Sequence, residues 1–309
     1  MAMVAWLFPG QGSQEVGMGR DVYEASAAGR AVFDEADAVL GFSLSRLCFE
    51  GPAGELQRTV NAQPAIMVTS VALLRAAQEL GPAALGGAPS FVAGHSLGEY
   101  SAVVAAGALP FADALRLVRR RGELMEHCGA IEPGTMAAVL GMDTDAVFAL
   151  AAEAGVEVAN VNAPGQVTVS GAVEGVLKAM ELAKARGASR VVQLDVSGAF
   201  HSRLMRPAAE GLAAAIAAAP LTDAAVPLAG NSTATLIRTA ADLRTELVQG
   251  LTQPVLWARS VQTLAAAGAG LWVEVGPGRV LTGLVRRTAG GAQVANVNSV
   301  AAIQKATAG

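Results

Sequence analysis

The sequence of 309 residues predicts an α/β fold, in which a large domain on a mostly parallel sheet is interrupted by a smaller inserted domain. Short apolar runs typical of strands alternate with helical patterns over most of the chain, and this order favours a parallel sheet. Residues 134–196 instead follow the order β-α-β-β-α-β, which is typical of ferredoxin-like domains. Within residues 90–104, a strand-like run meets a helix at a G-x-S-x-G spacing, the pattern of a nucleophile elbow.

The composition indicates a folded protein with a large apolar core. Hydrophobic residues make up 52% of the chain and charged residues 16%, so the chain is too apolar to be disordered. The net charge of −4 favours neither nucleic acid nor an anionic membrane as a partner. No apolar run approaches the length of a membrane span, and Met1–Phe8 lacks the basic leader of a signal peptide. We therefore expect a soluble, cytoplasmic protein.

The cysteines and histidines show no metal-binding pattern. Cys48 and Cys128 are far apart in the sequence, and we interpret them as free thiols in a reducing compartment, with a disulfide as the lesser alternative. The three histidines, His95, His127 and His201, are too scattered for a zinc site. We expect no bound metal.

In the first part of the chain, strands and helices alternate around glycine-rich loops. The strand Val4–Phe8 leads into loop 9–14, whose glycines allow backbone N–H groups to approach a ligand, although a plain connection is the simpler alternative. Pro64 suits the first turn of a helix. Further expected elements are helices over about 22–40, 65–80, 100–106 and 113–128, short pieces at 44–50 and 54–57, and a strand at 91–93.

The remaining elements divide the chain into residues 1–130 and 197–309, which form the large domain, and residues 131–196, which form the small one. In the small domain we expect strands at 135–140, 156–161, 166–170 and 190–196, with helices at 143–154 and 173–186. The large domain then resumes with helices over about 204–218, 240–251, 255–267 and 280–287 and strands at 226–229, 271–275 and 293–298.

Ser96 is a candidate nucleophile because it lies at the centre of the G-x-S-x-G spacing. Gly94 and Gly98 leave room where a side chain would clash with a neighbouring backbone. The helix that follows directs its free N–H groups and positive dipole end toward developing negative charge. The plain alternative is a tight turn in which Ser96 only caps the helix.

Arg121 is a candidate anion-binding residue because it lies on the apolar face of its helix. Leu117, Val118, Leu124 and Met125 lie three and four residues on either side of it. The opposite, solvated face carries the charged side chains of Arg116, Arg119, Arg120 and Glu123. A buried arginine needs a partner. That partner is either an internal Asp or Glu, or a carboxylate ligand bound by the guanidinium fork.

His201 is the candidate general base for Ser96. It follows the last strand of the small domain in a loop, and catalytic residues concentrate at such strand ends in α/β folds. His95 is adjacent to Ser96, so its side chain should point away from the serine, and His127 should be exposed at a helix end. Asp195 is one candidate to orient His201, and a backbone carbonyl is the other. A histidine satisfied by local backbone remains the plain alternative.

Six segments in order carry a family resemblance: F-P-G-Q-G-S-Q (8–14), G-H-S-L-G-E (94–99), R-G-E-L-M (121–125), G-A-F-H-S (198–202), P-V-L-W (254–257) and E-V-G-P-G (274–278). They resemble the malonyl-CoA:acyl carrier protein transacylases of fatty acid and polyketide synthesis. The matches cover nearly the whole chain. The resemblance implies an α/β-hydrolase-like large domain with a ferredoxin-like insert, and ping-pong transfer of a malonyl group.

The resemblance also implies the catalytic roles. Ser96 carries the malonyl ester, and His201 acts as general base and then as general acid. A backbone carbonyl near Gly250 holds the other ring nitrogen of His201. The backbone N–H groups of Gln11 and Leu97 form the oxyanion hole. The resemblance implies no metal and no redox cofactor. Coenzyme A is part of the substrate and not a cofactor.

The substrate roles implied by the resemblance fall on three residues. Arg121 grips the malonyl carboxylate, and Gln63 lines the pocket. Phe200 is typical of malonyl-selective members. Methylmalonyl-selective members usually have a smaller residue at this position, which leaves room for the extra methyl group. The implied partners are malonyl-CoA and an acyl carrier protein, and a monomer is expected. An α/β esterase or thioesterase, a non-catalytic carrier-protein docking subunit and a malonate decarboxylase transferase subunit remain as alternatives.

Overall fold

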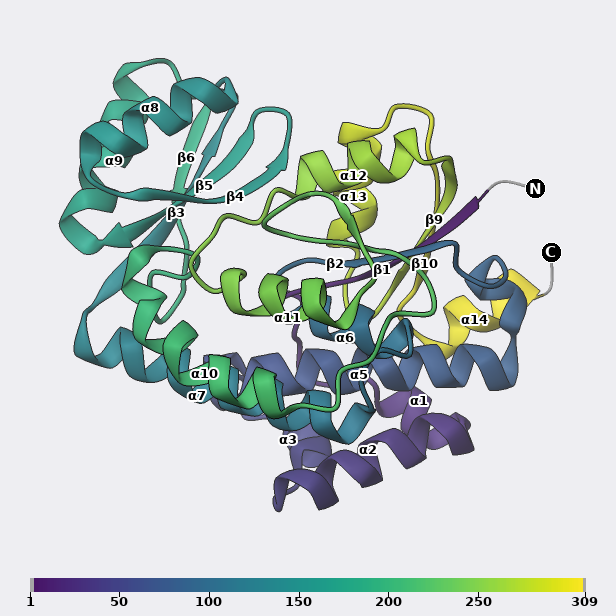
Figure 1. Ribbon diagram of the computed structural model, residues 1–309. Coiled ribbons are helices and arrows are strands. Elements are labelled where there is room, and N and C mark those ends of the chain that lie inside the picture. The colour runs from purple at the N-terminus through teal and green to yellow at the C-terminus, as the bar shows by residue number, and fades with distance from the viewer. Residues whose placement is uncertain (1–2, 308–309) are drawn as a thin grey trace.

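The computed structural model describes residues 3–307, and a six-stranded sheet, sheet A, lies at its centre (Figure 1). Its strands are β1 (Met3–Phe8), β2 (Phe91–Gly94), β7 (Leu228–Ala229), β8 (Leu236–Ile237), β9 (Ala269–Val275) and β10 (Gln293–Val297). Their order is β10-β9-β1-β2-β7-β8. Every neighbouring pair is parallel except β7 with β8. The predicted mostly parallel α/β fold is confirmed.

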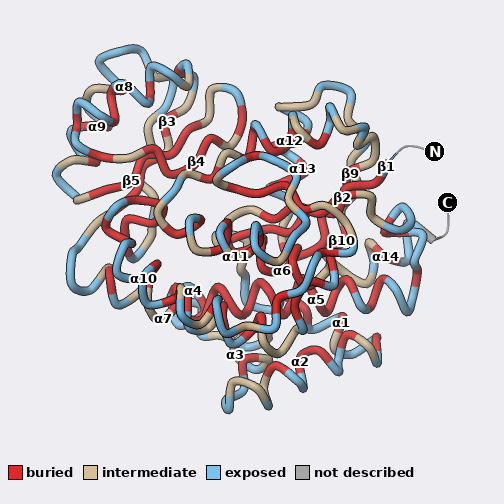
Figure 2. Tube along the Cα trace, in the orientation of Figure 1, coloured by how far each residue is buried: buried red, intermediate tan, exposed pale blue. Residues whose placement is uncertain are grey.

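Both faces of sheet A are covered by helices, so its strands are apolar on both sides. In β1, Val4, Trp6 and Phe8 pack into one core and Ala5 and Leu7 into another. The helices of the first core include α5 (Thr59–Leu80), α6 (Gly98–Ala105), α7 (Phe111–Ile131) and α10 (Arg206–Ala218), whereas α12 (Trp257–Ala266) and α13 (Val280–Thr288) cover the second face. Figure 2 shows the burial of β1 and β2 and of most of α5.

The inserted segment forms a separate four-stranded sheet, sheet B, with two helices on one face (Figure 1, upper left). Its elements are β3 (Gly134–Leu140), α8 (Thr144–Ala154), β4 (Glu157–Ala163), β5 (Gln166–Ala172), α9 (Val173–Ala185) and β6 (Arg190–Gln193). The sheet is antiparallel with order β4-β5-β3-β6, which matches the ferredoxin-like arrangement. Its valine-rich core is separate from those of sheet A. The exact domain boundaries stay a prediction.

Several elements differ from the sequence prediction. The helical pattern expected over 22–40 consists of two helices, because the chain breaks at Ser26 into α1 (Arg20–Ala25) and α2 (Ala27–Leu40), and the Ser26 hydroxyl accepts the N–H of Gly29 at 2.9 Å. Helix α5 begins before Pro64 instead of at it. Strand β8, the helix α14 (Val300–Thr307) and the 3-10 turns η1 (Pro82–Leu85) and η2 (Arg203–Met205) were not predicted.

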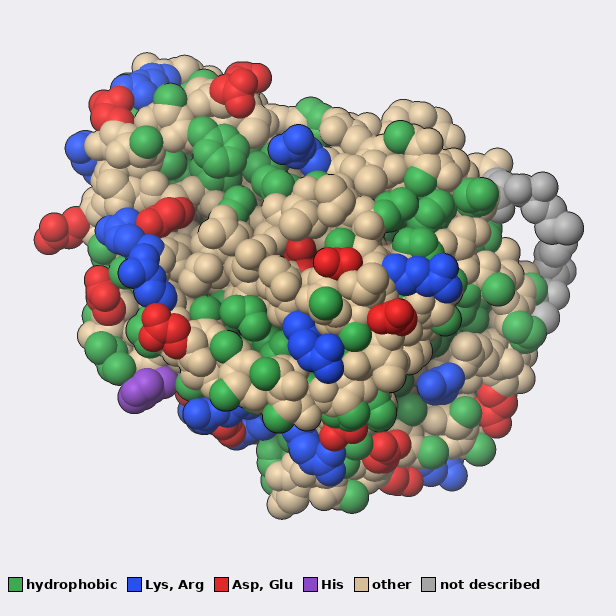
Figure 3. Space-filling view, in the orientation of Figure 1, with side chains coloured by type: hydrophobic (Ala, Val, Ile, Leu, Met, Phe, Trp, Pro, Cys, Tyr) green, Lys and Arg blue, Asp and Glu red, His purple; other side chains and the backbone are tan. Residues whose placement is uncertain are grey.

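The remaining helices are α3 (Leu44–Glu50), α4 (Ala53–Gln57) and α11 (Ala240–Gln249). No helix within residues 3–307 is long and apolar enough to cross a membrane. On the face seen in Figure 3, Lys and Arg side chains are interspersed with Asp and Glu. Because β1, β2 and β7 run parallel, the loops that follow them meet at one edge of sheet A, and this edge carries the candidate site.

Candidate active site

Ser96 lies in a strained turn between β2 and α6, as the sequence motif predicts. Its φ angle is 50°, in the left-handed region that non-glycine residues rarely adopt. A Cβ added at Gly94 would lie 2.0 Å from the carbonyl carbon of Gly98, and one at Gly98 would lie 2.1 Å from the carbonyl oxygen of Phe8. Only glycine fits at both positions, so the motif packs the elbow tightly against β1.

His201 faces Ser96 across the site, with 2.8 Å between its Nε2 and the serine Oγ. Its Nδ1 lies 3.2 Å from the carbonyl oxygen of Gln253. The sequence prediction placed this carbonyl near Gly250, and the hydrogen bond at 3.2 Å comes from Gln253, because the chain turns back after α11 and presents the later carbonyl to the ring as well. The Gly250 carbonyl lies close enough to favour the charged ring. Asp195 is exposed and makes no hydrogen bond to His201.

Burial keeps His201 neutral. Loss of solvation, with the positive charge of Arg121 as a second cause, lowers the pKa of His201 to about 3. At neutral pH the ring is therefore unprotonated, with Nε2 free to accept the Ser96 proton when Nδ1 donates to the Gln253 carbonyl. The pair has the geometry of a nucleophile and its base, oriented by a backbone carbonyl instead of a carboxylate.

Arg121 is buried at 2% exposure and reaches the serine from α7. Its Nη1 donates to Oε1 of Gln63 at 2.6 Å, and its Nη2 donates to Oγ of Ser96 at 3.1 Å. Within residues 3–307, no Asp or Glu lies within ion-pair distance of it, so the internal salt bridge considered from sequence is not formed. Glu99 lies close enough to act on the charge of Arg121, but burial and the charge of Glu246 hold the pKa of Glu99 well above its usual value.

Gln63 is positioned by the first turns of α5, which a proline would ordinarily disrupt. Pro64 has no N–H to offer the carbonyl of Val60, one turn before it. The Nη1 of Arg119 donates to that carbonyl at 3.1 Å and also to Oδ1 of Asn61 at 3.1 Å. Arg119, expected on the solvated face, is therefore half-buried and replaces the missing helical hydrogen bond.

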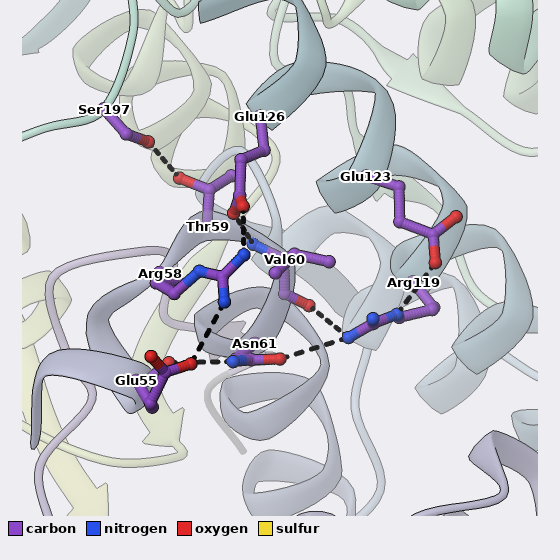
Figure 4. Close-up of polar contacts among 9 residues, drawn as sticks. All are labelled: Glu55, Arg58, Thr59, Val60, Asn61, Arg119, Glu123, Glu126 and Ser197. Atoms are coloured by element: carbon purple, nitrogen blue, oxygen red, sulfur yellow. Dashed lines mark hydrogen bonds and ion pairs between the residues drawn. The ribbon is translucent and has the colours of Figure 1, made fainter. Parts of the chain in front are cut away.

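A cavity of about 620 Å³ opens in front of Ser96, His201 and Arg121. Phe200 and Met125 give it apolar walls, and Gln11 also lines it. Gln11 Nε2 donates to Thr59 Oγ1 at 3.2 Å, and the Thr59 and Ser197 hydroxyls lie 2.8 Å apart (Figure 4). Within the described chain, the backbone N–H groups of Gln11 and Leu97 have no protein partner.

The other histidines and cysteines lie outside this arrangement. His95 Nε2 is 2.8 Å from Oδ1 of Asn162 on β4, so its ring points away from Ser96, while His127 is exposed. Cys48 and Cys128 are free and buried, and the disulfide alternative is wrong. Over residues 3–307 there is no group of three or more His, Cys, Asp or Glu side chains arranged to hold a metal.

Two residues at the site carry no sequence signal that predicted them. The Gln253 carbonyl holds His201, but a backbone carbonyl has no residue signature. Asn231, which follows β7, accepts the backbone N–H of Ser96 at 2.7 Å through its Oδ1. It lies far from Ser96 in sequence, so only the fold brings the two together.

The comparison with protein families agrees with this geometry. A family model described as an acyl transferase domain matches residues 5–309. The chain belongs to the acyl transferase family. As a member of this family it is an enzyme, and the recognition made from the six sequence segments is confirmed.

Curated relatives and solved structures are similar to this chain over nearly its whole length. The malonyl CoA-acyl carrier protein transacylases of Bacillus subtilis (strain 168) and Escherichia coli (strain K12) are 48% and 44% identical over 93% of this chain, covering 90% and 93% of those proteins. The crystal structure of an acyl-carrier-protein S-malonyltransferase from Burkholderia pseudomallei 1710b is 41% identical, with a TM-score of 0.93 and 99% of each chain covered.

Proposed function

We propose that this enzyme transfers a malonyl group from malonyl-CoA to the phosphopantetheine thiol of an acyl carrier protein. The observation that carries the proposal is Arg121, a buried cation beside Ser96 with no carboxylate partner within residues 3–307. A malonyl group supplies a carboxylate at a short distance from its thioester carbonyl. The names of the relatives support the same substrate.

In the first half-reaction, the Oγ of Ser96 attacks the thioester carbonyl carbon while Nε2 of His201 takes its proton. The distance of 2.8 Å between these atoms supports direct transfer. The carbonyl electron pair moves to oxygen, and the N–H groups of Gln11 and Leu97 stabilise this oxyanion. The carbon–sulfur bond then breaks, and coenzyme A leaves with the proton from His201. Malonyl-serine remains.

In the second half-reaction, the carrier-protein thiol takes the place that coenzyme A has left. His201 removes the thiol proton, the sulfur attacks the ester carbonyl, and Ser96 Oγ recovers its proton as the carbon–oxygen bond breaks. The neutral state of His201 supports this role, because a protonated ring would accept no proton. These steps need no metal and no redox cofactor.

Selectivity for malonyl rests on Arg121, Gln63 and Phe200. When malonyl binds, its carboxylate takes the Nη2 donor that Ser96 Oγ holds in the free enzyme, while Nη1 stays on Gln63. A neutral acyl group would leave the buried cation unpaired. The Phe200 ring, which lines the cavity beside His201, restricts the space for a branching methyl group.

The acyl carrier protein as partner is supported by the relatives. One similar structure, 39% identical with a TM-score of 0.93 and 99% of each chain covered, is a malonyl-transacylase in complex with a type II PKS acyl-carrier protein. We propose the same class of partner here, for fatty acid or polyketide synthesis, in a monomeric cytoplasmic enzyme.

The test compares transfer with hydrolysis. Purified enzyme is given malonyl-CoA with and without a holo carrier protein, and both malonyl carrier protein and free malonate are measured. We expect malonyl carrier protein to form much faster than free malonate. Malonate release at a comparable rate without the carrier protein would favour an esterase, and absence of both products would favour a docking subunit.

A further inference from the structure

Asn231 lies beside the elbow because β7 pairs with β2. The register places Ala93 of β2 opposite Ala229 of β7, so Asn231, shortly after β7, comes level with the turn at Ser96. Asn231 is buried at 2% exposure and does not line the cavity in front of Ser96. It therefore contacts the elbow from the protein interior and not from the cavity.

Its side chain holds the elbow at both ends. Oδ1 accepts the Ser96 N–H at 2.7 Å, and Nδ2 donates to the carbonyl of Gly94 at 2.7 Å. Nδ2 also donates to Oε1 of Glu99 at 2.8 Å, and the same carboxylate oxygen accepts the Asn231 backbone N–H at 2.9 Å. Three successive parts of the strand–turn–helix unit are thus fixed by one amide group.

Its main chain reaches the segment that holds His201. The carbonyl of Asn231 accepts the N–H of Leu256 at 2.7 Å. Leu256 lies just after Gln253, whose carbonyl is 3.2 Å from Nδ1 of His201. One residue therefore connects the backbone of the nucleophile with the backbone that orients the base.

The turn needs such support because Ser96 is held at a φ of 50°, which is costly for a residue with a side chain. Within residues 3–307, the Ser96 N–H makes its one hydrogen bond to Asn231, so without this side chain the turn is free to relax. A small displacement of Oγ would lengthen its 2.8 Å contact with Nε2 of His201.

We infer that Asn231 is a positioning residue that fixes the Ser96 elbow and the His201-holding segment in a common reactive geometry, and that Glu99 fixes Asn231. The inference rests on the proposed reaction only in taking Ser96 as the nucleophile. Asn231 touches neither acyl donor nor acceptor, so its loss lowers the rate of chemistry and leaves substrate affinity unchanged.

The test deletes two asparagine side chains in similar surroundings. Asn296 on β10 also donates through Nδ2 to a backbone carbonyl, that of Gly278 at 3.1 Å, and to a buried carboxylate, that of Glu274 at 3.4 Å. For Asn231→Ala we expect kcat to fall about 100-fold with KM within about threefold. For Asn296→Ala we expect kcat within about twofold of wild type. Thermal melts of both variants confirm folding.

Labelling of Ser96 by phenylmethylsulfonyl fluoride separates this inference from the proposed substrates, since the reagent needs neither malonyl-CoA nor a carrier protein. We expect labelling to slow in Asn231→Ala by about the same factor as kcat. If both variants keep similar kcat and labelling rates, or if the loss in Asn231→Ala appears in KM alone, the inference is wrong.

A measurement on the wild type covers the case in which Asn231→Ala does not fold. Hydrogen–deuterium exchange at the Ser96 backbone amide should be strongly protected, because its N–H is donated to a buried acceptor. Exchange as fast as in an exposed loop would overturn the inference whatever the variants do.

Discussion

The two sides of the site are held in different ways. Ser96 and His201 are held through backbone groups, since Asn231 takes the Ser96 N–H and the Gln253 carbonyl faces the imidazole. Arg121 and Gln63 are instead held by two long helices, α7 and α5, and by a hydrogen bond between their side chains. In the proposed reaction, the chemical step depends on main-chain geometry and substrate recognition on two side chains. We therefore expect a substitution at Arg121 or Gln63 to change the choice of substrate more than the reaction itself.

The largest expected effect is on the chemical side. His201→Ala should lower malonyl transfer by about 10⁴-fold or more, because it removes the ring nitrogen that lies 2.8 Å from the Ser96 hydroxyl and takes its proton in the proposed reaction. His127→Ala, the loss of an exposed histidine, is the matched control and should leave steady-state transfer at the wild-type rate. A loss below about tenfold in His201→Ala would show that the base lies elsewhere.

The second prediction tests the recognition side. Arg121→Ala should lower kcat/KM for malonyl-CoA by about 10³-fold and transfer from acetyl-CoA by about tenfold at most, since only malonyl needs the buried cation. Arg120→Ala on the same helix removes an exposed arginine and is the control. Equal losses with both acyl donors would contradict the binding of the malonyl carboxylate by Arg121. They would show that Arg121 acts in the chemical step and not in substrate recognition.

A smaller effect is expected at Phe200, which lines the same cavity as Ser96, His201 and Arg121. Phe200→Ser should raise the methylmalonyl to malonyl ratio of kcat/KM about tenfold, because the cavity gains room for one methyl group. Phe148→Ser, at a ring 41% exposed on α8, is the matched control. An unchanged ratio in a competition assay would remove Phe200 from substrate selection.

The smallest expected effect is that of mild acid on the chemical side. Because burial and Arg121 lower the pKa of His201 to about 3, kcat/KM should change little between about pH 7 and about pH 5. An acid limb near pH 6.5 in the pH–rate profile would mean that His201 is not desolvated.

The same histidine affects stability. The unfolded chain binds a proton at this histidine below its ordinary pKa and the folded chain does not, so the free energy of unfolding should fall as pH drops below about 6.5.

The same division explains what the sequence could predict. Gly94 and Gly98 are recognisable because only glycine fits their close contacts, and Arg121 because helical periodicity places a charge on an apolar face. The main-chain partners were not predictable. The prediction named a carbonyl near Gly250 but not that of Gln253, and Asn231 was not singled out, because such contacts depend on how distant segments meet.

Tertiary contacts also override local signals within elements. Pro64 favours a helix start, yet α5 continues through it because Arg119, distant in sequence, satisfies the carbonyl that proline leaves free. In contrast, the β-α-β-β-α-β segment was predicted in full, because its alternation of strands and helices is local. Errors in the prediction therefore gather where a partner from elsewhere in the chain decides the structure.

The most direct measurement follows the malonyl group itself. Wild-type enzyme and Ser96→Ala are incubated with malonyl-CoA, and intact mass spectrometry is followed by peptide mapping and a chase with holo carrier protein. We predict a malonyl adduct on Ser96 that disappears as malonyl carrier protein forms, and no adduct in Ser96→Ala. An adduct that persists in Ser96→Ala, or one that the carrier protein does not remove, would contradict transfer through Ser96.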